Sequence, residues 1–185
     1  QEALPAGYAR AATVLAELAD HAAGLGVRLA IEPISHWETA APNTLAELQA
    51  FLELVPNPQL GVVIDSAHET LDGAGPECFA AQVEALAMAG RLHYVQLSPP
   101  DRGRLDRSWL PWTPFLERVL PYYQGPLAIE MFNALPVFQP LLRLSRRKYW
   151  IAGVDAPSND PSAMDVAAAS LAASRKVVAA VLATL

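Results

Sequence analysis

The stretch Leu60-Gly61-Val62-Val63-Ile64-Asp65 runs through apolar residues and glycine and ends on a carboxylate. A short run of this kind is typical of a strand in a parallel sheet, where helices cover both faces. Three further runs end in the same way, each followed by a side chain that carries a carbonyl-type oxygen. These runs are residues 27–31 before Glu32, 92–95 before Gln96 and 126–129 before Glu130.

The four strand ends recur at nearly even intervals. Glu32, Asp65, Gln96 and Glu130 are separated by 33, 31 and 34 residues, and helix-like segments fill the intervals. This alternation predicts an α/β fold with a parallel sheet. Because parallel strands place their carboxyl ends on one side, three acids and one amide should converge there. Oxygen donors of this kind suit a hard cation and a polar substrate.

The intervals between the strands carry helical patterns and stop signals. Apolar residues from Tyr8 to Leu25 recur at helical spacing, and Gly24 and Gly26 end that pattern. Asn43-Thr44 looks like the N-terminal cap of a helix that continues through Leu54. Further helices are predicted over residues 76–88, 114–120 and 162–185, and residues 155–161 are predicted to be a linker. Ankyrin arrays have a similar period, but they lack strands of this type, and their signature is absent.

Composition limits the possible classes of protein. A chain of 185 residues with 52% hydrophobic and 17% charged residues indicates one well-buried globular domain, shorter than a barrel of ~250 residues. The net charge of −6 argues against nucleic acid as a partner. The single cysteine, Cys78, excludes an intrachain disulfide framework and favours a reducing, cytoplasmic location. No long uncharged apolar run or signal peptide is present, so no membrane partner is expected. The chain begins at Gln1, which suggests a fragment or a processed form.

Four motifs carry a resemblance to a known family, one for each predicted strand. They are Ile31-Glu32-Pro33 with Glu38-Thr39 and Asn43-Thr44; Asp65 with His68; Ser98 through Arg102-Gly103; and Ala128-Ile129-Glu130 with Phe132. In this order they resemble the sugar isomerase/epimerase superfamily of xylose isomerase-like TIM barrels. The nearest types are the D-tagatose/D-psicose 3-epimerases, with hydroxypyruvate isomerases related.

The resemblance implies a fold. The motifs belong to the last four strands of the family's barrel, so residues 1–154 should form the C-terminal half of a TIM (β/α)8 barrel, followed by the linker and a C-terminal helix. Half a barrel leaves two open strand edges and apolar surface to be covered. Either a missing N-terminal half or a second copy in a homodimer should cover them.

The resemblance also implies an activity and roles for residues. The family's reaction is epimerisation or isomerisation of a ketose, or of a small hydroxy-ketone, by proton removal beside a carbonyl through an enediolate. A divalent cation, Mn²⁺ or Mg²⁺, is implied, held by Glu32, Asp65, Gln96 and Glu130. Glu32 and Glu130 would also act as base and acid, and Glu38, His68 and Arg102 would bind the substrate hydroxyls.

Gln96 departs from the family pattern, which has a histidine ligand at this position. An amide oxygen can still bind a cation without changing the formal charge, and it should favour Mg²⁺ or Mn²⁺ over softer ions. One alternative follows from this departure: a degenerate barrel that binds sugars without turning them over. A further alternative, still enzymatic, is a dehydratase acting on a cyclic polyol ketone through the same enediolate. The related apurinic endonucleases need several histidine zinc ligands and a DNA-binding surface, which this acidic chain does not offer.

Other residues admit structural explanations. Glu38 can serve a turn, Arg102 a surface loop, and His68 a helix start or the core. The tryptophans Trp37, Trp109 and Trp112 can wall the pocket or pack under loops. His21, His93 and Cys78 are expected to be structural, with Cys78 in the core. The cluster of Arg143, Arg146, Arg147 and Lys148 indicates a solvated helix face, or alternatively a phosphate grip near the last strand.

Overall fold

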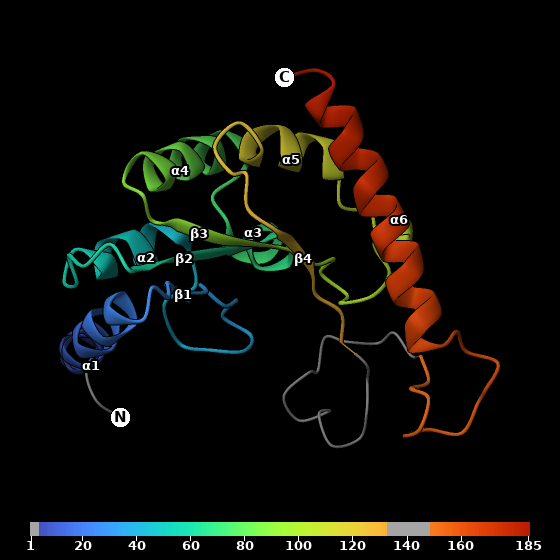
Figure 1. The fold of residues 1–185 in the computed structure, drawn as a ribbon, viewed down its shortest axis with the longest axis horizontal. Helices are drawn as coiled ribbons and strands as arrows, with labels where there is room; N and C mark the ends of the chain where they lie inside the picture. Colours follow the sequence, from blue (N-terminus) through green and yellow to red (C-terminus); the bar gives the residue numbers. More distant parts are fainter. Residues whose placement is uncertain (1–3, 133–148) are drawn as a thin grey trace.

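The computed structural model describes residues 4–132 and 149–185. Its centre is one sheet of four strands in the order β1-β2-β3-β4, with every neighbouring pair parallel (Figure 1). The strands are β1 (Leu29–Ile31), β2 (Leu60–Asp65), β3 (Leu92–Leu97) and β4 (Leu127–Ile129). The predicted α/β fold with four parallel strands is confirmed, because each apolar run forms its strand and strands adjacent in sequence pair in space.

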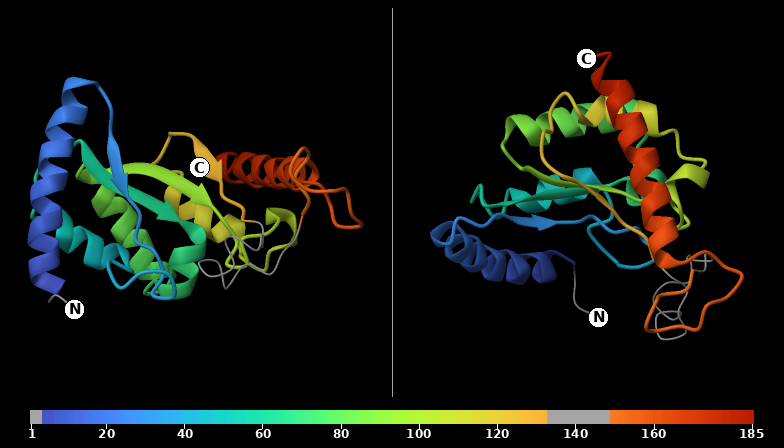
Figure 2. Two further views of the ribbon diagram at one scale, coloured as in Figure 1. Left: turned by 90° about the horizontal axis from the view of Figure 1, so that it is seen from below. Right: turned by 45° about the vertical axis from the view of Figure 1, so that its right-hand side comes forward.

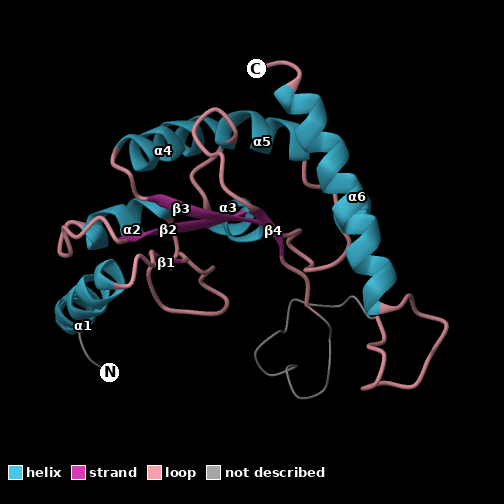
Figure 3. Cartoon of the chain, in the orientation of Figure 1, coloured by secondary structure: helices cyan, strands magenta, loops and turns pink. Residues whose placement is uncertain are grey.

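Helices connect the strands and follow the sheet in chain order (Figures 1 and 2). They are α1 (Leu4–Gly24), α2 (Leu45–Leu52), α3 (Ser66–Asp72), α4 (Pro76–Met88), the 3₁₀ turn η1 (Leu105–Arg107), α5 (Trp112–Val119) and α6 (Ala163–Leu182). In these figures, α1 and α6 lie at opposite ends of the row of helices. Long loops connect β1 to α2 and β3 to α5 (Figure 3).

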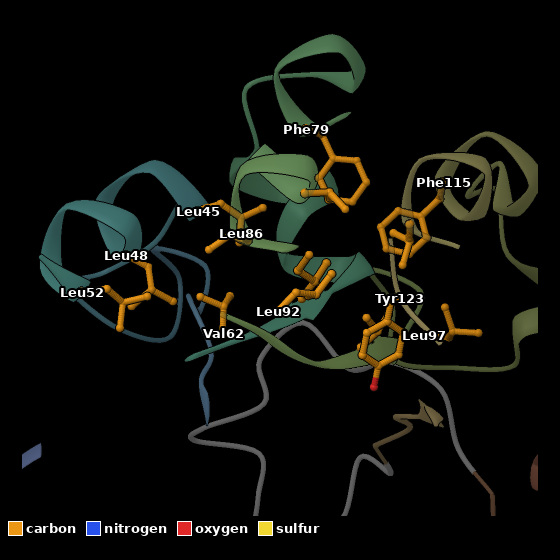
Figure 4. Close-up of a cluster of buried hydrophobic side chains, with 14 of the residues drawn as sticks. Leu45, Leu48, Leu52, Val62, Phe79, Leu86, Leu92, Leu97, Phe115 and Tyr123 are labelled. Atoms are coloured by element: carbon orange, nitrogen blue, oxygen red, sulfur yellow. The ribbon is translucent and has the colours of Figure 1, made fainter. Parts of the chain in front are cut away.

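The core lies between the sheet and the helices that pack on it. Leu48 of α2, Val62 of β2, Val95 of β3 and Leu116 of α5 are fully buried and belong to one cluster. Figure 4 shows part of this cluster, with Leu48 and Val62 labelled. Burying a side chain of this size contributes roughly 1.5–3 kcal/mol relative to leaving it exposed. The cluster therefore fixes the helices against β2 and β3, which carry two of the predicted ligands at their ends.

Side-chain caps set where several helices begin. Thr44 and Glu47 form a capping box at the start of α2, as the Asn43-Thr44 pattern predicted. Asp65 caps α3, a short helix that the sequence analysis did not anticipate. Ser162 and Asp165 form a second capping box that starts α6. That helix packs against α5 and η1, and Ser170 Oγ accepts a hydrogen bond from Leu105 N–H at 3.2 Å.

Arg91 ties together the chain just before β2, at the end of the sheet opposite the carboxylates. Its Nη1 donates to the carbonyls of Asn57, at 2.7 Å, and Leu60, and its Nη2 donates to the carbonyl of Val55 at 3.1 Å. His93 is structural, as predicted: it is buried, and its Nδ1 lies 2.7 Å from the carbonyl of Leu29.

Replacing Arg91 with methionine should destabilise the fold by about 2 kcal/mol. The substitution keeps the apolar stem but leaves three carbonyls without their charged donor, and hydrogen bonds to charged groups contribute about 1.5–3 kcal/mol. Urea denaturation measures the change, with exposed Arg107→Met as the charge-matched control. Equal midpoints for the two variants would contradict this assignment.

Glu69 lies in a groove beside Phe79, Pro111 and Phe115, away from the carboxylates. Burial raises the pKa of Glu69 to about 7 from its ordinary 4.5. The folded state therefore favours the protonated carboxyl. Its stabilising contribution is complete below about pH 4.5 and is lost as the pH rises through 7.

Glu69→Gln should consequently be less sensitive to pH than the wild type. Between pH 5 and pH 8 the wild type should lose about 1 kcal/mol more stability than the variant, a magnitude reduced because Glu69 is partly exposed. Thermal melts at both pH values measure the difference, with exposed Glu77→Gln as the control. Parallel pH dependence of Glu69→Gln and wild type would rule out this role for Glu69.

Several side chains that the sequence analysis singled out are exposed. Cys78 is exposed on α4, so its placement in the core was wrong: the apolar face of α4 turns Phe79, Val83 and Leu86 inward instead. Trp37 and Trp109 are strongly exposed. The basic cluster at residues 143–148 lies outside the described residues.

Within the described ranges, no helix is both long and apolar enough to cross a membrane.

Candidate active site

The strand ends bring the predicted ligands to one place. Asp65 and Gln96 are register partners in β2 and β3, so their side chains leave the sheet on the same side and at the same height. Glu32 follows β1 directly. Glu130 follows β4, and its N–H donates to the carbonyl of Leu97 at 3.1 Å. All four predicted cation ligands therefore belong to one end of the sheet.

Asp65 is buried and is held by the start of α3. Its Oδ1 accepts hydrogen bonds from the N–H groups of Ala67, at 2.7 Å, and His68, at 3.0 Å. These are the free donors of a helix N-terminus, which also favours negative charge there. One residue thus ends the strand, caps the helix and directs a carboxylate into the site.

His68 lies at the same helix start and is fixed by a backbone donor. Its Nδ1 accepts from Ser35 N–H at 3.0 Å, and a neutral ring that accepts at Nδ1 carries its proton on Nε2. Nε2 faces Glu32 Oε1 at 3.5 Å. Burial, and then the nearby Arg102, lower the pKa of His68, which favours the neutral ring. His68 therefore presents an N–H donor to the site.

Glu32, Asp65 and His68 nevertheless form a group with the spacing of a metal site. One candidate ligand atom from each lies within 4.8 Å of the others. A neutral histidine binds metal through a lone pair, which Nε2 lacks while Ser35 donates to Nδ1. The hydrogen-bond geometry thus supports Glu32 and Asp65 as cation ligands and His68 as a donor beside them.

Arg102 reaches into the middle of these groups. Its buried guanidinium places Nη1 2.7 Å from Glu130 Oε2 and 3.3 Å from each oxygen of Asp65. Nη2 lies 3.6 Å from Glu38 Oε1 and 2.7 Å from His68 Nε2. The guanidinium also lies over the ring of Phe132, 5.2 Å from its centroid. The arginine loop after β3 is therefore part of the site and is not a surface turn.

Burial, and then neighbouring carboxylates, raise the pKa of Glu32 and of Glu130. Burial, together with Asp65 and Glu130, raises the pKa of Glu32 to about 8, although Arg102 opposes the shift. Burial and the Asp65 carboxylate raise the pKa of Glu130 to about 7. Two carboxyls that titrate near neutrality can each accept or release a proton at ordinary pH.

Two buried oxygens in the site have no hydrogen-bond partner. They are Glu32 Oε1 and Gln96 Oε1. A buried acceptor without a donor costs about 1–3 kcal/mol, so such atoms call for a ligand. Both atoms are oxygens, as Mg²⁺ and Mn²⁺ prefer, and the carboxylates of Asp65 and Glu130 are near. The donor set fits a hard divalent cation held by the four predicted ligands.

Some supporting residues were not anticipated from the sequence. Ser66 Oγ donates to the carbonyl of Ser98 at 2.7 Å and accepts from Ser98 N–H at 2.8 Å, so it joins the ends of β2 and β3. Ser98 Oγ in turn accepts from Arg102 Nη1 at 2.7 Å. The position of Ser66, directly after the predicted ligand Asp65, was the available signal, since a hydroxyl there lies between two adjacent strand ends.

A second unanticipated pair holds the loop after β1. The backbone N–H of His36 donates to Asp72 Oδ2, and its ring Nδ1 lies 2.6 Å from Asp72 Oδ1. Asp72 ends α3, so the pair fastens the loop that carries Glu38 to the helix that carries His68. No motif in the sequence marks this contact, which joins residues 36 positions apart.

The sequence of this chain is similar to those of known proteins. Residues 1–155 match the family described as "Xylose isomerase-like TIM barrel". The chain belongs to this family. It is 27% identical to a ketose 3-epimerase of Arthrobacter globiformis over 78% of its own length and 48% of that protein. It is 30% identical to an L-ribulose 3-epimerase of Methylomonas sp. (strain DH-1), over 68% of this chain and 43% of the relative.

Solved structures of the xylose isomerase-like family agree with this fold. A candidate sugar phosphate isomerase/epimerase from Anabaena variabilis ATCC 29413 is 53% identical with a TM-score of 0.90, over 94% of this chain and 53% of that one. A D-allulose 3-epimerase from Methylomonas sp. is 25% identical with a TM-score of 0.75, over 92% and 55%. The chain thus spans about half the length of the relatives that it matches, which confirms that its four strands form half of a TIM barrel.

Proposed function

We propose that this chain supplies the cation-binding and proton-transferring half of a divalent-metal-dependent ketose epimerase, most closely a ketose 3-epimerase. The observation that carries the proposal is geometric: ligand atoms of Glu32 and Asp65 lie within 4.8 Å of each other, and Arg102 Nη1 contacts both Asp65 and Glu130. The names of the relatives, a ketose 3-epimerase and an L-ribulose 3-epimerase, support the same substrate class.

The proposed roles follow from the chemistry of each group. One of Glu32 and Glu130 removes the proton from the carbon beside the carbonyl, and the other returns a proton to the opposite face. A cation held by Glu32, Asp65, Gln96 and Glu130 would polarise the carbonyl and stabilise the negative charge of the enediolate oxygens. His68 Nε2–H and the Arg102 guanidinium donate hydrogen bonds to substrate oxygens, and Glu38 accepts from a hydroxyl.

Two other functions remain as alternatives. In a sugar-binding barrel without catalysis, sugar hydroxyls would donate to the oxygens of Glu32 and Gln96 that lack partners here, so proton exchange at the sugar carbon separates the two functions. A dehydratase would use the same enediolate but would expel a hydroxide as water. Product analysis separates this reaction from epimerisation, because the dehydrated product has lost one water.

The completed barrel should form through the two open edges of the sheet. In the described residues, β1 and β4 each pair on one side only, and the face of α1 that includes Leu4, Tyr8 and Ala12 lines an open groove with Leu54. We propose that four further strands, from a longer chain or a second copy, cover these surfaces. Sedimentation of the chain alone tests this: dimers support the second copy, and capture of an N-terminal half-barrel supports the longer chain.

The proposed activity is tested by proton exchange. The completed barrel, with Mn²⁺, is incubated with D-fructose, D-allulose, D-tagatose and L-ribulose in D₂O, and deuterium at the carbon beside the carbonyl is followed by NMR. We expect deuterium incorporation together with the epimer. A barrel that binds Mn²⁺ yet exchanges no proton with any ketose would support the sugar-binding alternative instead.

A further inference from the structure

We infer that the Arg102 guanidinium and a divalent cation are mutually exclusive occupants of the carboxylate cluster, so that cation binding expels Arg102 toward Glu38. This inference rests on the proposed function and adds a regulated step to it. Glu32, Asp65 and Glu130 form this carboxylate cluster. The guanidinium acts as an internal counter-ion for it until the cation arrives.

The position of the guanidinium is the first argument. Nη1 lies within 3.3 Å of both Asp65 oxygens and 2.7 Å from Glu130 Oε2. A cation shared by Asp65 and Glu130 would draw on the same two carboxylates. A guanidinium nitrogen and a divalent ion would repel each other there, because both are positively charged and both are held by the oxygens of these side chains.

The guanidinium is also an incomplete substitute for the ion. It leaves Glu32 Oε1 and Gln96 Oε1 without a partner although both are buried. A planar fork donates along fixed directions, whereas Mg²⁺ or Mn²⁺ gathers oxygens from around a sphere. The unsatisfied pair of oxygens marks the part of the shell that Arg102 does not reach.

Arg102 and His68 face each other with hydrogen-bond donors, which makes the present position of the guanidinium costly. His68 Nδ1 accepts from Ser35 N–H, so Nε2 carries a proton, yet Arg102 Nη2 lies 2.7 Å from that nitrogen. Two N–H donors at this distance repel unless one of them moves. This repulsion favours release of the guanidinium when a stronger cation is available.

Glu38 provides the destination for the released guanidinium. Its Oε1 already lies 3.6 Å from Nη2, and it stands on the loop after β1, outside the carboxylate cluster. A modest rotation of the arginine side chain would exchange the Asp65 and Glu130 contacts for a closer pair with Glu38. The guanidinium would then face the substrate space beside the cation, so metal binding would prepare Arg102 for the substrate.

The test is Mn²⁺ affinity by calorimetry in the complete protein, without substrate. Arg102→Met should bind Mn²⁺ at least tenfold more tightly than wild type, because no internal cation has to leave. Arg104→Met is the matched control, since Arg104 pairs with Asp106 at 2.7 Å two residues further along, and it should bind as wild type does. Without metal, Arg102→Met should melt at a lower temperature than wild type, and Mn²⁺ should raise its melting temperature by more.

The outcomes separate this inference from the proposed function. Equal or weaker Mn²⁺ binding by Arg102→Met overturns the competition but leaves the metal-dependent enzyme standing. Absence of binding in every variant at millimolar Mn²⁺ overturns both. Should Arg102→Met fail to fold, Arg102→Lys keeps a positive charge with a shorter reach; at least threefold tighter binding supports the inference, and wild-type affinity overturns it.

Discussion

Glu130→Gln in the completed barrel should lower kcat for ketose epimerisation by at least about a thousandfold. The substitution keeps the size of the side chain but removes a carboxyl that we assign both to proton transfer and to the cation. General acid–base catalysis alone contributes about 10²–10⁴-fold. Loss of one cation ligand adds to this, because the charge on the enediolate would then be stabilised less well.

The measurement should separate the two contributions. Calorimetry with Mn²⁺ gives the change in cation affinity, and rates at saturating Mn²⁺ give the change in proton transfer. Glu117→Gln on the exposed side of α5 is the matched control and should leave both unchanged. If Glu130→Gln keeps wild-type epimerisation at saturating Mn²⁺, Glu130 is not the acid or the base, and Glu32 must work with another group.

The strands could be predicted from the sequence because each one is marked by a local feature, a short apolar run. Each of the four apolar runs is long enough to form a strand, and parallel pairing brings their carboxyl ends together. Asp65 and Gln96 are register partners for this reason, each at or directly beside the carboxyl end of its apolar run. The family resemblance could then attach roles to these residues, and the fold that it implied is confirmed.

The parts that could not be predicted depend on side-chain contacts over long separations. Nothing near Ser35 in the sequence shows that its N–H fixes the tautomer of His68, 33 residues away. The insertion of Arg102 between Asp65 and Glu130 likewise depends on the turn in which Arg102 N–H donates to the carbonyl of Pro99, and on the contact of its guanidinium with Ser98 Oγ. Helix α3 was missed for another reason: Asp65 did carry the N-cap signal, but seven residues are too few for a helical period to be recognised.

Gln96 stands where the family has a histidine ligand, and its position in the structure bears on whether it binds the cation. Its amide oxygen is buried, unpartnered and level with Asp65, which is the position of a ligand rather than of a discarded one. A degenerate site would be expected to turn the amide toward hydrogen-bond donors, since an unsatisfied oxygen is costly. This placement is the ground for our proposal that Gln96 binds the cation through its oxygen.

Gln96→His should accordingly tighten metal binding by about 10–100-fold, with a larger gain for Co²⁺ and Zn²⁺ than for Mg²⁺. Imidazole is a better donor than an amide for these softer ions, whereas Mg²⁺ prefers oxygen. The affinities of the four ions Mg²⁺, Mn²⁺, Co²⁺ and Zn²⁺ for wild type and variant measure the effect. Exposed Gln124→His controls for adventitious binding by an added histidine.

The order of the gains in affinity across the four ions is more informative than the affinity for any one of them. If Gln96 is a ligand, the gain must rise from Mg²⁺ to Zn²⁺, because only the identity of one donor atom has changed. A uniform gain would indicate a general change in the site, and no gain would show that residue 96 lies outside the coordination shell. In that last case Glu32, Asp65 and Glu130 would hold the cation without β3, and the oxygen of Gln96 would face the substrate.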